Sequence, residues 1–392
     1  MERIILHIDV NNAFLSWTAV DMLNNGSLID IRKIPSVICG SKENRTGIVL
    51  AKSMPAKKMG VVSAEVLYLA FRKCPNLKTY PPNYSLYEKM SNSLFDFLRT
   101  YTPDIEIASI DECYMDYGKV KNLYGDEVKF AYKLKDEIKN KFGFTVNIGV
   151  ANNKLCAKMA SDFEKPDKVH TLYMNEIETK MWPLPISFLF GIGKQTSDKL
   201  IKLGIKTVKD LALYDRYKLS KYFKNTYSDL INRANGIDDS VVDGTLVAPK
   251  GISNEVTLKS DISNKKDLLP YLMFLSEKTS KRLRDEGKYA SVICLILKDC
   301  YFKRKNHQKK IKNPTNLVKD IYDTSLLLLD EMWDDTPVRL IGIRLDNLTD
   351  SYNYQTSLFD TNSRKEEEDI DRLLDSINKK YGHSVIKKGE FK

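Results

Sequence analysis

The chain has 392 residues, with 62 Lys and Arg against 52 Asp and Glu, which gives a formal net charge of +10. This length exceeds one ordinary domain core, so about three or four domains are expected, and a hydrophobic fraction of 42% excludes disordered and fibrous classes. The positive charge favours a polyanionic partner, with nucleic acid ahead of an anionic membrane surface. No apolar run approaches the roughly twenty residues of a membrane-spanning helix, and the N-terminus MERIILHIDV lacks the apolar block of a signal peptide. The sequence therefore predicts a cytoplasmic protein with no membrane partner.

The first region of the chain predicts a ferredoxin-like sheet with a small insertion. The expected elements are a strand over 4–10, a helix over 13–22, short strands at 36–39 and 48–51, a helix over 85–100, strands over 105–110 and 113–117, a helix over 128–142 and a strand over 145–150. In this split βαβ order, the end of the first strand lies beside the turn between the two central strands. Asp9 is therefore expected to face Asp111 and Glu112.

The second region predicts a helix-hairpin-helix followed by a mixed basic module. The hairpin is the tight turn of Gly191, Ile192 and Gly193 between apolar helical stretches. A linker over 235–251, with three glycines and one proline, precedes a unit with strands over 291–297 and 338–345. Polar residues beyond Asp350 and a charge-mixed helix over 365–380 predict a tail.

Three carboxylates at adjacent strand ends can hold two divalent cations about 3.5 to 4 Å apart, the arrangement that serves phosphoryl transfer. Mg²⁺ suits such oxygen ligands, with Mn²⁺ as a substitute, whereas the lack of nearby Cys and His disfavours zinc. The alternative is that Asp9 is a turn residue and that Asp111 and Glu112 form a solvated hairpin tip.

Two segments, HIDVNNAFLSW and SIDECYMDY, resemble the acidic motifs of the Y-family DNA polymerases, and the resemblance spans nearly the whole chain. It implies that Asp9, Asp111 and Glu112 bind metal together with the Val10 backbone carbonyl. It also implies that the backbone of Asn12, Ala13 and Phe14 cradles the triphosphate. Phe14 would be the steric gate that excludes a ribose 2′-hydroxyl; its alternative role is core packing.

Two further segments resemble triphosphate-binding motifs of this family. In LAKSMPAKKMGV the resemblance assigns a phosphate contact to Lys57, although many relatives have tyrosine at the position of Met54 and arginine at that of Lys57. In NKLCAKMASDFEKPDKV it assigns a phosphate contact to Lys165. Lys57 could instead be merely solvated, and Lys154 and Lys158 either contact DNA or face water.

The remaining matches concern DNA and a protein partner. The hairpin corresponds to the family's thumb and implies phosphate contacts by Gly191, Gly193 and Lys194, unless the turn only caps a helix. The basic module resembles the little finger, with Lys303, Arg304 and Lys305 as DNA contacts, or else is an ordinary solvated face. The peptide QTSLF resembles the motif by which bacterial polymerases bind the sliding clamp, unless it is accidental. Its anchors are Gln355, Leu358 and Phe359.

The sequence thus predicts an α+β multidomain polymerase. Its expected parts are a palm (1–12 and 80–172), fingers (13–79), a helix-hairpin-helix thumb (173–240), an α/β little finger (245–348) and a flexible tail with the clamp peptide (349–392). The expected activity is low-fidelity, template-directed transfer of dNMP from dNTP to a primer 3′ end during translesion synthesis, by a monomer bound to primer–template DNA. A nucleotidyl cyclase and a noncatalytic DNA-binding scaffold are the rival interpretations, and the DinB-like and UmuC-like branches both stay open.

Overall fold

The computed structural model describes residues 3–41, 47–245, 248–350 and 363–381, without the side chains of 363–365. The chain forms two compact units, one of Met1–Gly40 with Ile48–Leu246 and the other of Ser41–Gly47 with Val247–Lys392. None of the helices in the described ranges combines the length and the apolar character that a membrane span requires.

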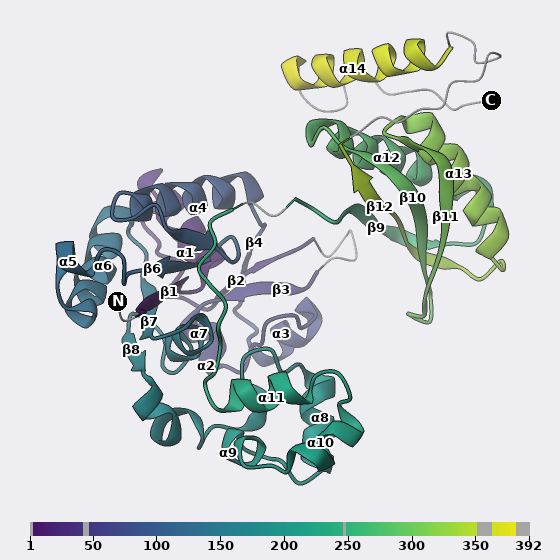
Figure 1. The fold of residues 1–392 in the computed structure, drawn as a ribbon. Coiled ribbons are helices and arrows are strands. Elements are labelled where there is room, and N and C mark those ends of the chain that lie inside the picture. Colours follow the sequence, from purple (N-terminus) through teal and green to yellow (C-terminus); the bar gives the residue numbers. More distant parts are fainter. Residues whose placement is uncertain (1–2, 42–46, 246–247, 351–362, 382–392) are drawn as a thin grey trace. The chain divides into compact units, whose positions relative to one another are not determined.

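The first unit is built on a sheet in the order β5-β6-β1-β7-β8 (Figure 1). Its strands are β1 (Ile5–Val10), β5 (Ile105–Ile107), β6 (Glu112–Asp116), β7 (Val146–Ala151) and β8 (Val169–Leu172). β1 runs antiparallel to both β6 and β7, and β8 is parallel to β7. This order confirms the predicted ferredoxin-like fold, with β8 as an addition. Every residue of β1 is buried, which explains why its sequence reads as a nearly continuous apolar run.

Alternation along β1 assigns its side chains to two faces. Ile4, Leu6, Ile8 and Val10 join a core with helices α4 (Tyr84–Arg99) and α6 (Glu127–Phe142); a short helix, α5 (Lys121–Tyr124), precedes α6. Ile5 instead joins a second core with α7 (Lys154–Ser161). Because neighbouring strand residues point to opposite faces, His7 and Asp9 lie on the α7 side with Ile5.

Helix α7 lies unusually close to the sheet because of Gly149 in β7. A Cβ atom at Gly149 would lie 2.0 Å from the Ala157 carbonyl oxygen and 2.5 Å from the Ser161 nitrogen. The absent side chain therefore lets α7 pack directly on β7, which brings Lys158 and Ser161 down to the level of β1.

The insertion forms a small sheet in the order β3-β2-β4. Its elements are β2 (Ser36–Cys39), β3 (Val49–Lys52), α2 (Met54–Lys58), α3 (Leu67–Lys73) and β4 (Lys78–Tyr80). Helix α1 (Ala13–Asn24) connects it to the main sheet, since Trp17 is buried in the main core while Leu15 and Ala19 pack against the small sheet. The predicted boundary between residues 12 and 13 thus coincides with the start of a helix shared by both parts.

Short helices complete the first unit and share the second core with α7. They are η1 (Met174–Glu176), η2 (Ile177–Met181), η3 (Ile186–Phe188), α8 (Lys194–Lys202), α9 (Val208–Ala212), α10 (Arg216–Tyr222) and α11 (Tyr227–Ala234). The predicted hairpin lies between η3 and α8, so the helix before it is a single 3₁₀ turn.

The second unit is an antiparallel sheet in the order β11-β10-β12-β9, with α12 and α13 packed on one face (Figure 1). Its elements are β9 (Gly251–Ile262), α12 (Lys265–Asp285), β10 (Tyr289–Asp299), β11 (Arg304–Thr315), α13 (Val318–Met332) and β12 (Val338–Thr349). β11, an edge strand, is the basic stretch for which no strand was predicted, because Ile311 is its one large apolar residue.

The predicted flexible tail over 349–392 differs from the structure at residues 363–381, which form helix α14 (Ser363–Tyr381). Asp371 on this helix is 2% exposed, accepts a hydrogen bond from the Val318 N–H at 3.1 Å, and lies 3.3 Å from Arg284. Asp375 lies 2.6 Å from the same guanidinium. These contacts hold α14 against α12 and the start of α13.

Candidate active site

The predicted metal ligands come from the ends of two neighbouring strands. Asp9 in β1 is directly opposite Glu112 in β6. The Val10 N–H donates to the Asp111 carbonyl at 3.0 Å, which holds the turn before β6 against the end of β1. Because directly paired residues project to the same face, the carboxylates of Asp9 and Glu112 both point toward α7.

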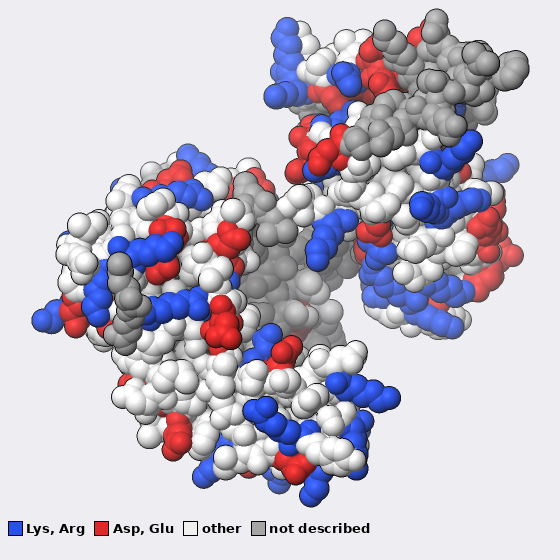
Figure 2. Space-filling view, in the orientation of Figure 1, with Lys and Arg blue, Asp and Glu red and all other residues white. Residues whose placement is uncertain are grey.

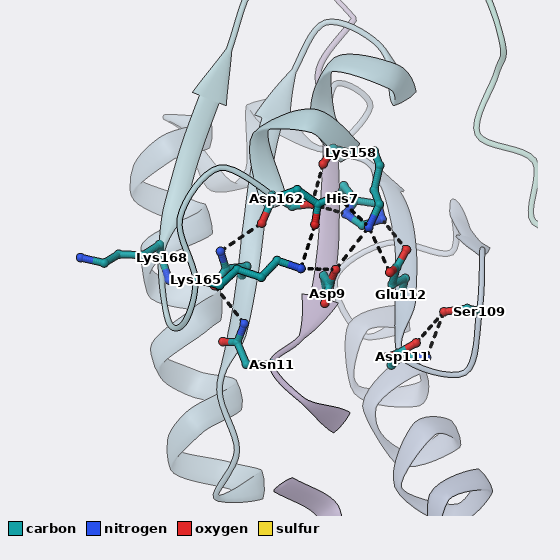
Figure 3. A network of polar contacts seen from close by, with 12 residues as sticks. His7, Asp9, Asn11, Ser109, Asp111, Glu112, Lys158, Asp162, Lys165 and Lys168 are labelled. Carbon is teal, nitrogen blue, oxygen red and sulfur yellow. Dashed lines mark hydrogen bonds and ion pairs between the residues drawn. The ribbon is translucent and has the colours of Figure 1, made fainter. Parts of the chain in front are cut away.

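Two lysine ammonium groups lie on these carboxylates (Figure 3). Lys158 on α7 places its Nζ 3.3 Å from Asp9 and 3.0 Å from Glu112. Lys165, in the loop after α7, lies 2.8 Å from Asp9 and 2.8 Å from Asp162. The expectation that Lys158 contacts DNA or faces water is wrong, because its side chain is 9% exposed and bridges the two carboxylates.

Burial and charge act against each other in this cluster. Burial raises the pKa of Asp9, although Lys165 and Lys158 oppose that effect. Burial also acts on Glu112, but contacts with His7 and Lys158 outweigh it and lower the pKa of Glu112 to about 2. Against the effect of burial, the carboxylates raise the pKa of both lysines. The cluster is therefore a set of compensating charges in which Asp9 and Lys158 are buried and Lys165 is partly exposed.

The third carboxylate, Asp111, accepts a hydrogen bond from Ser109 Oγ at 2.7 Å and lies outside the lysine cluster (Figure 3). Over the described ranges, no three acidic, histidine or cysteine side chains come close enough together to hold a metal ion. The donor chemistry nevertheless fits Mg²⁺, since the strand ends offer carboxylate and backbone carbonyl oxygens. To join Asp9 and Glu112 around a cation, the Asp111 side chain has to turn away from Ser109.

Helix α1 begins at Ala13, shortly after Asp9 in the chain. Its N-cap, Asn12, has left-handed dihedrals (φ 53°, ψ 52°), and no side-chain hydrogen bond caps the helix within the described chain. The N–H groups of Ala13 and Phe14 belong to the first turn, where an α-helix supplies no internal acceptor. Free N–H groups at a helix start attract anions, so this end of α1 suits a phosphate.

Two lysines of the small sheet add positive charge nearby. The Asn12 amide donates to the Lys52 carbonyl at 2.7 Å, which connects the start of α1 to β3. Burial, together with the charge of Lys57, lowers the pKa of Lys52. Lys57 is exposed on α2. Sequence reasoning missed Lys52, which reads there as an ordinary strand-end lysine.

Phe14, the predicted gate, is held by other aromatic rings. It stacks on Tyr87 with ring centroids 4.4 Å apart and planes 7° apart, and it meets the edge of Tyr84 at 6.1 Å. Tyr87 is fully buried and lies 3.1 Å from the Thr18 hydroxyl. Packing thus fixes the ring while leaving it partly exposed, so the core-packing role is observed and the gate role stays a prediction.

Known proteins are similar to this chain over nearly its whole length. Models of the impB/mucB/samB family match residues 8–162 and, for its C-terminal domain, residues 249–358, and a model of the IMS family HHH motif matches residues 175–205. The chain is 46% identical to a DNA polymerase IV of Clostridium acetobutylicum over 98% of this chain and 97% of the relative. It is 33% identical to DNA polymerase IV 1 of Bacillus subtilis over 99% of this chain and 92% of the relative.

A solved structure is similar as well. It is a Y-family DNA polymerase chimera of Dbh and Dpo4, with a TM-score of 0.76 and 26% identity, covering 89% of this chain and all of that one. The chain belongs to the Y family of DNA polymerases. Membership of the Y family implies the use of divalent cations.

In this Y-family chain the thumb hairpin has a basic neighbour that sequence reasoning missed. Gly191 has a φ of +88°, and a Cβ there would lie 2.2 Å from an Nη atom of Arg233 on α11. Gly193 is the N-cap of α8, with open space around it, and Lys194 follows as an exposed residue. Glycine at 191 therefore allows the Arg233 guanidinium to lie directly on the hairpin.

The predicted little-finger contacts divide between the two faces of the second unit's sheet. Lys305 is opposite the core residue Leu297, so it lies on the helix side, where it pairs with Asp334. Arg304 projects to the other face and pairs with Glu255 at 2.5 Å, and Lys303 is exposed in the turn before β11. Figure 2 shows Lys and Arg side chains gathered over the end of the second unit where β10 and β11 meet.

The predicted clamp peptide, with Gln355, Leu358 and Phe359, lies outside the described residues. The structure also reveals a partner of Glu112 that sequence reasoning missed, His7, located two residues before Asp9 on the same face of β1. The alternation of the strand was a usable signal for it, because every second residue of β1 faces α7.

Proposed function

We propose that the chain is a translesion DNA polymerase that catalyses low-fidelity, template-directed addition of dNMP from dNTP to a primer 3′ end. The observation that carries the proposal is the pairing of Asp9 with Glu112 beside Asp111, with Lys158 and Lys165 on the carboxylates. This arrangement occurs in a chain related over almost its whole length to DNA polymerase IV proteins.

The residues of this site fall into groups that bind the metal ions, bind the triphosphate or select the sugar. Asp9, Asp111, Glu112 and the Val10 carbonyl would hold two Mg²⁺ ions, or Mn²⁺ as a substitute, and the bound ions would supply charge stabilisation for phosphoryl transfer. Asn12, Ala13 and Phe14 present N–H groups to the triphosphate, and Lys57 and Lys165 neutralise its charge. Lys165 suits this task because its side chain is 36% exposed, whereas Lys158 is enclosed. The Phe14 ring excludes a 2′-hydroxyl.

The remaining contacts position the DNA, while template pairing selects the base. Gly191, Gly193 and Lys194 bind backbone phosphates at the thumb, as do Lys303, Arg304 and Lys305 on the little finger. The peptide containing Gln355, Leu358 and Phe359 binds the sliding clamp. We place the protein in the cytoplasm, because DNA and dNTP are found there.

The test is Mg²⁺-dependent primer extension on undamaged and abasic templates. Changing Asp111→Asn together with Glu112→Gln should lower the rate by a factor on the order of 10³ or more, because charge stabilisation by the metals is lost. Asp116→Asn is the matched control, since Asp116 lies on the same strand as Glu112 but opposite Ile5. Undiminished extension by the double variant would remove these residues from the catalytic site.

No observation favours a nucleotidyl cyclase or a noncatalytic scaffold. A cyclase needs no template, so the thumb hairpin and the basic second unit would have no role in it. A scaffold would not need carboxylates buried against lysines, which are costly to keep.

A further inference from the structure

His7 is a buried imidazole that the proposed mechanism does not use. It is 0% exposed, and its ring lies 4.7 Å from that of Tyr114, its cross-strand partner. Its Nδ1 lies 2.8 Å from Ser161 Oγ, and its Nε2 lies 3.4 Å from Glu112 Oε2 (Figure 3). Within the described chain, Nε2 has no partner at full hydrogen-bond geometry, so its contact with Glu112 stands on the ion-pair distance.

The proton positions follow from the partners. Glu112 is anionic, and a bare Nε2 lone pair would repel its carboxylate oxygen. The proton therefore lies on Nε2, which leaves the Nδ1 lone pair facing the Ser161 hydroxyl at 2.8 Å, a tautomer assigned from the contacts of the two ring nitrogens.

We propose that His7 is a positioning residue that fixes the Glu112 carboxylate through its Nε2–H, while Ser161 fixes the imidazole from the other side. Lys158 Nζ contacts Glu112 Oε1 at 3.0 Å, and His7 contacts the other carboxylate oxygen, Oε2. The two contacts together restrain the rotation of the carboxylate. This inference rests on the proposed function, in which Glu112 binds metal.

A packing role alone does not account for these contacts. An apolar side chain could fill the space beside Tyr114 without burying two ring nitrogens, each of which costs free energy unless it is hydrogen-bonded. Ser161 also has another acceptor within reach, the Lys158 carbonyl at 2.8 Å, so its hydroxyl proton has two competing acceptors, His7 and that carbonyl. Removing either His7 or Ser161 should therefore loosen Glu112.

The experiment compares two amides in the full-length protein. The amide nitrogen of His7→Gln reaches the position of Nε2, whereas that of His7→Asn reaches the position of Nδ1, so the pair separates the Glu112 contact from the Ser161 contact. Mn²⁺ binding, measured by electron paramagnetic resonance without DNA or nucleotide, should weaken roughly 10-fold in His7→Asn, as for other partners of metal ligands. It should stay within about 3-fold of wild type in His7→Gln.

A second variant tests the same inference if His7→Asn does not fold, as judged by thermal melting. Ser161→Ala leaves the imidazole in place but removes its hydroxyl partner, and it should weaken Mn²⁺ binding about 3-fold. Unchanged Mn²⁺ affinity in folded His7→Asn or in folded Ser161→Ala would overturn the inference. Equal weakening in His7→Asn and His7→Gln would also overturn it, because volume rather than the Nε2–H would then matter.

Glu112→Gln separates failure of this inference from failure of the proposed function. If Glu112→Gln loses Mn²⁺ binding while His7→Asn binds as wild type does, the inference is wrong and the metal assignment stands. If Glu112→Gln binds Mn²⁺ as tightly as wild type, the metal assignment is wrong and the role of His7 falls with it.

Discussion

Basic residues meet carboxylates in two regions of this polymerase, the palm cluster and strand β11 of the second unit. In the palm, the side chains of Lys158 and Asp9 are 9% and 7% exposed. In the second unit, the side chains of Arg304 on β11 and Glu255 on β9 are 52% and 29% exposed. Charges out of water interact strongly and hold a fixed geometry, whereas exposed pairs are weak and screened by salt. The first arrangement suits catalysis and the second suits DNA affinity.

The largest effect on stability is expected from Lys158→Met. This change leaves Asp9 and Glu112 facing each other in a buried site without their shared cation, and breaking a buried pair in this way costs about 3 to 5 kcal/mol. Urea unfolding at neutral pH measures the loss, with Lys168→Met as control, because Lys168 is half exposed and 3.8 Å from Glu164. A stability equal to that of wild type would mean that the lysine does not compensate the carboxylates.

Phe14→Ala tests a residue that is partly buried, less enclosed than the palm cluster and less exposed than the pair formed by Arg304. Without the ring, ribonucleotides should be incorporated more readily, and discrimination against them should fall roughly 10- to 100-fold. The measurement is kcat/KM for dNTP and rNTP with the same template. Tyr84→Ala removes a ring that touches Phe14 edge-on, and it should leave most of the discrimination intact. Unchanged discrimination in Phe14→Ala would exclude the gate role.

The clamp peptide should be tested by substitution, because deletion from Gln355 onward also removes α14 and its contacts with Arg284. Replacing Gln355, Leu358 and Phe359 with alanine should abolish most clamp-stimulated synthesis and leave synthesis without the clamp unchanged. Primer extension with and without the clamp measures both. Full stimulation of the variant would refute the docking role.

The smallest effects are expected from substitutions on β11. They should change the affinity for DNA and its dependence on salt concentration. Arg304→Ala should weaken DNA binding several-fold and reduce the slope of log K against log salt by about 1. Glu255→Gln should strengthen binding, because it releases Arg304 from its ion pair. Lys305→Ala should change binding less than Arg304→Ala, since Lys305 lies on the helix side. Fluorescence anisotropy over a salt series measures these, and equal effects of the two alanine variants would contradict the division between faces.

The palm sheet and the convergence of Asp9 with Glu112 were predictable because they depend on local signals. β1 is mostly apolar and carries an aspartate one residue before its end, and alternation fixes which side chains share a face. The place of Lys158 was not predictable, because it depends on how closely α7 approaches β7 over Gly149. That contact joins segments whose spacing along the chain carries no signal.

The second unit also has features that could not be predicted from the sequence. β11 has too few apolar residues to be recognised as a strand, and it is held by pairing with β10. Helix α14 was expected from its charge pattern, but its docking depends on Asp371 meeting Arg284, 87 residues away in sequence. Long-range ion pairs of this kind leave no periodic trace in the sequence.

The most direct test of the two-metal site is a crystal structure of the protein with primer–template DNA, an incoming dNTP analogue and Mg²⁺. We predict two Mg²⁺ ions bound by Asp9, Asp111 and Glu112, with Asp111 turned from Ser109 and Lys158 displaced from between the carboxylates. A nucleotide bound in the palm with Lys158 still bridging Asp9 and Glu112, and the metal ions bound elsewhere, would contradict it.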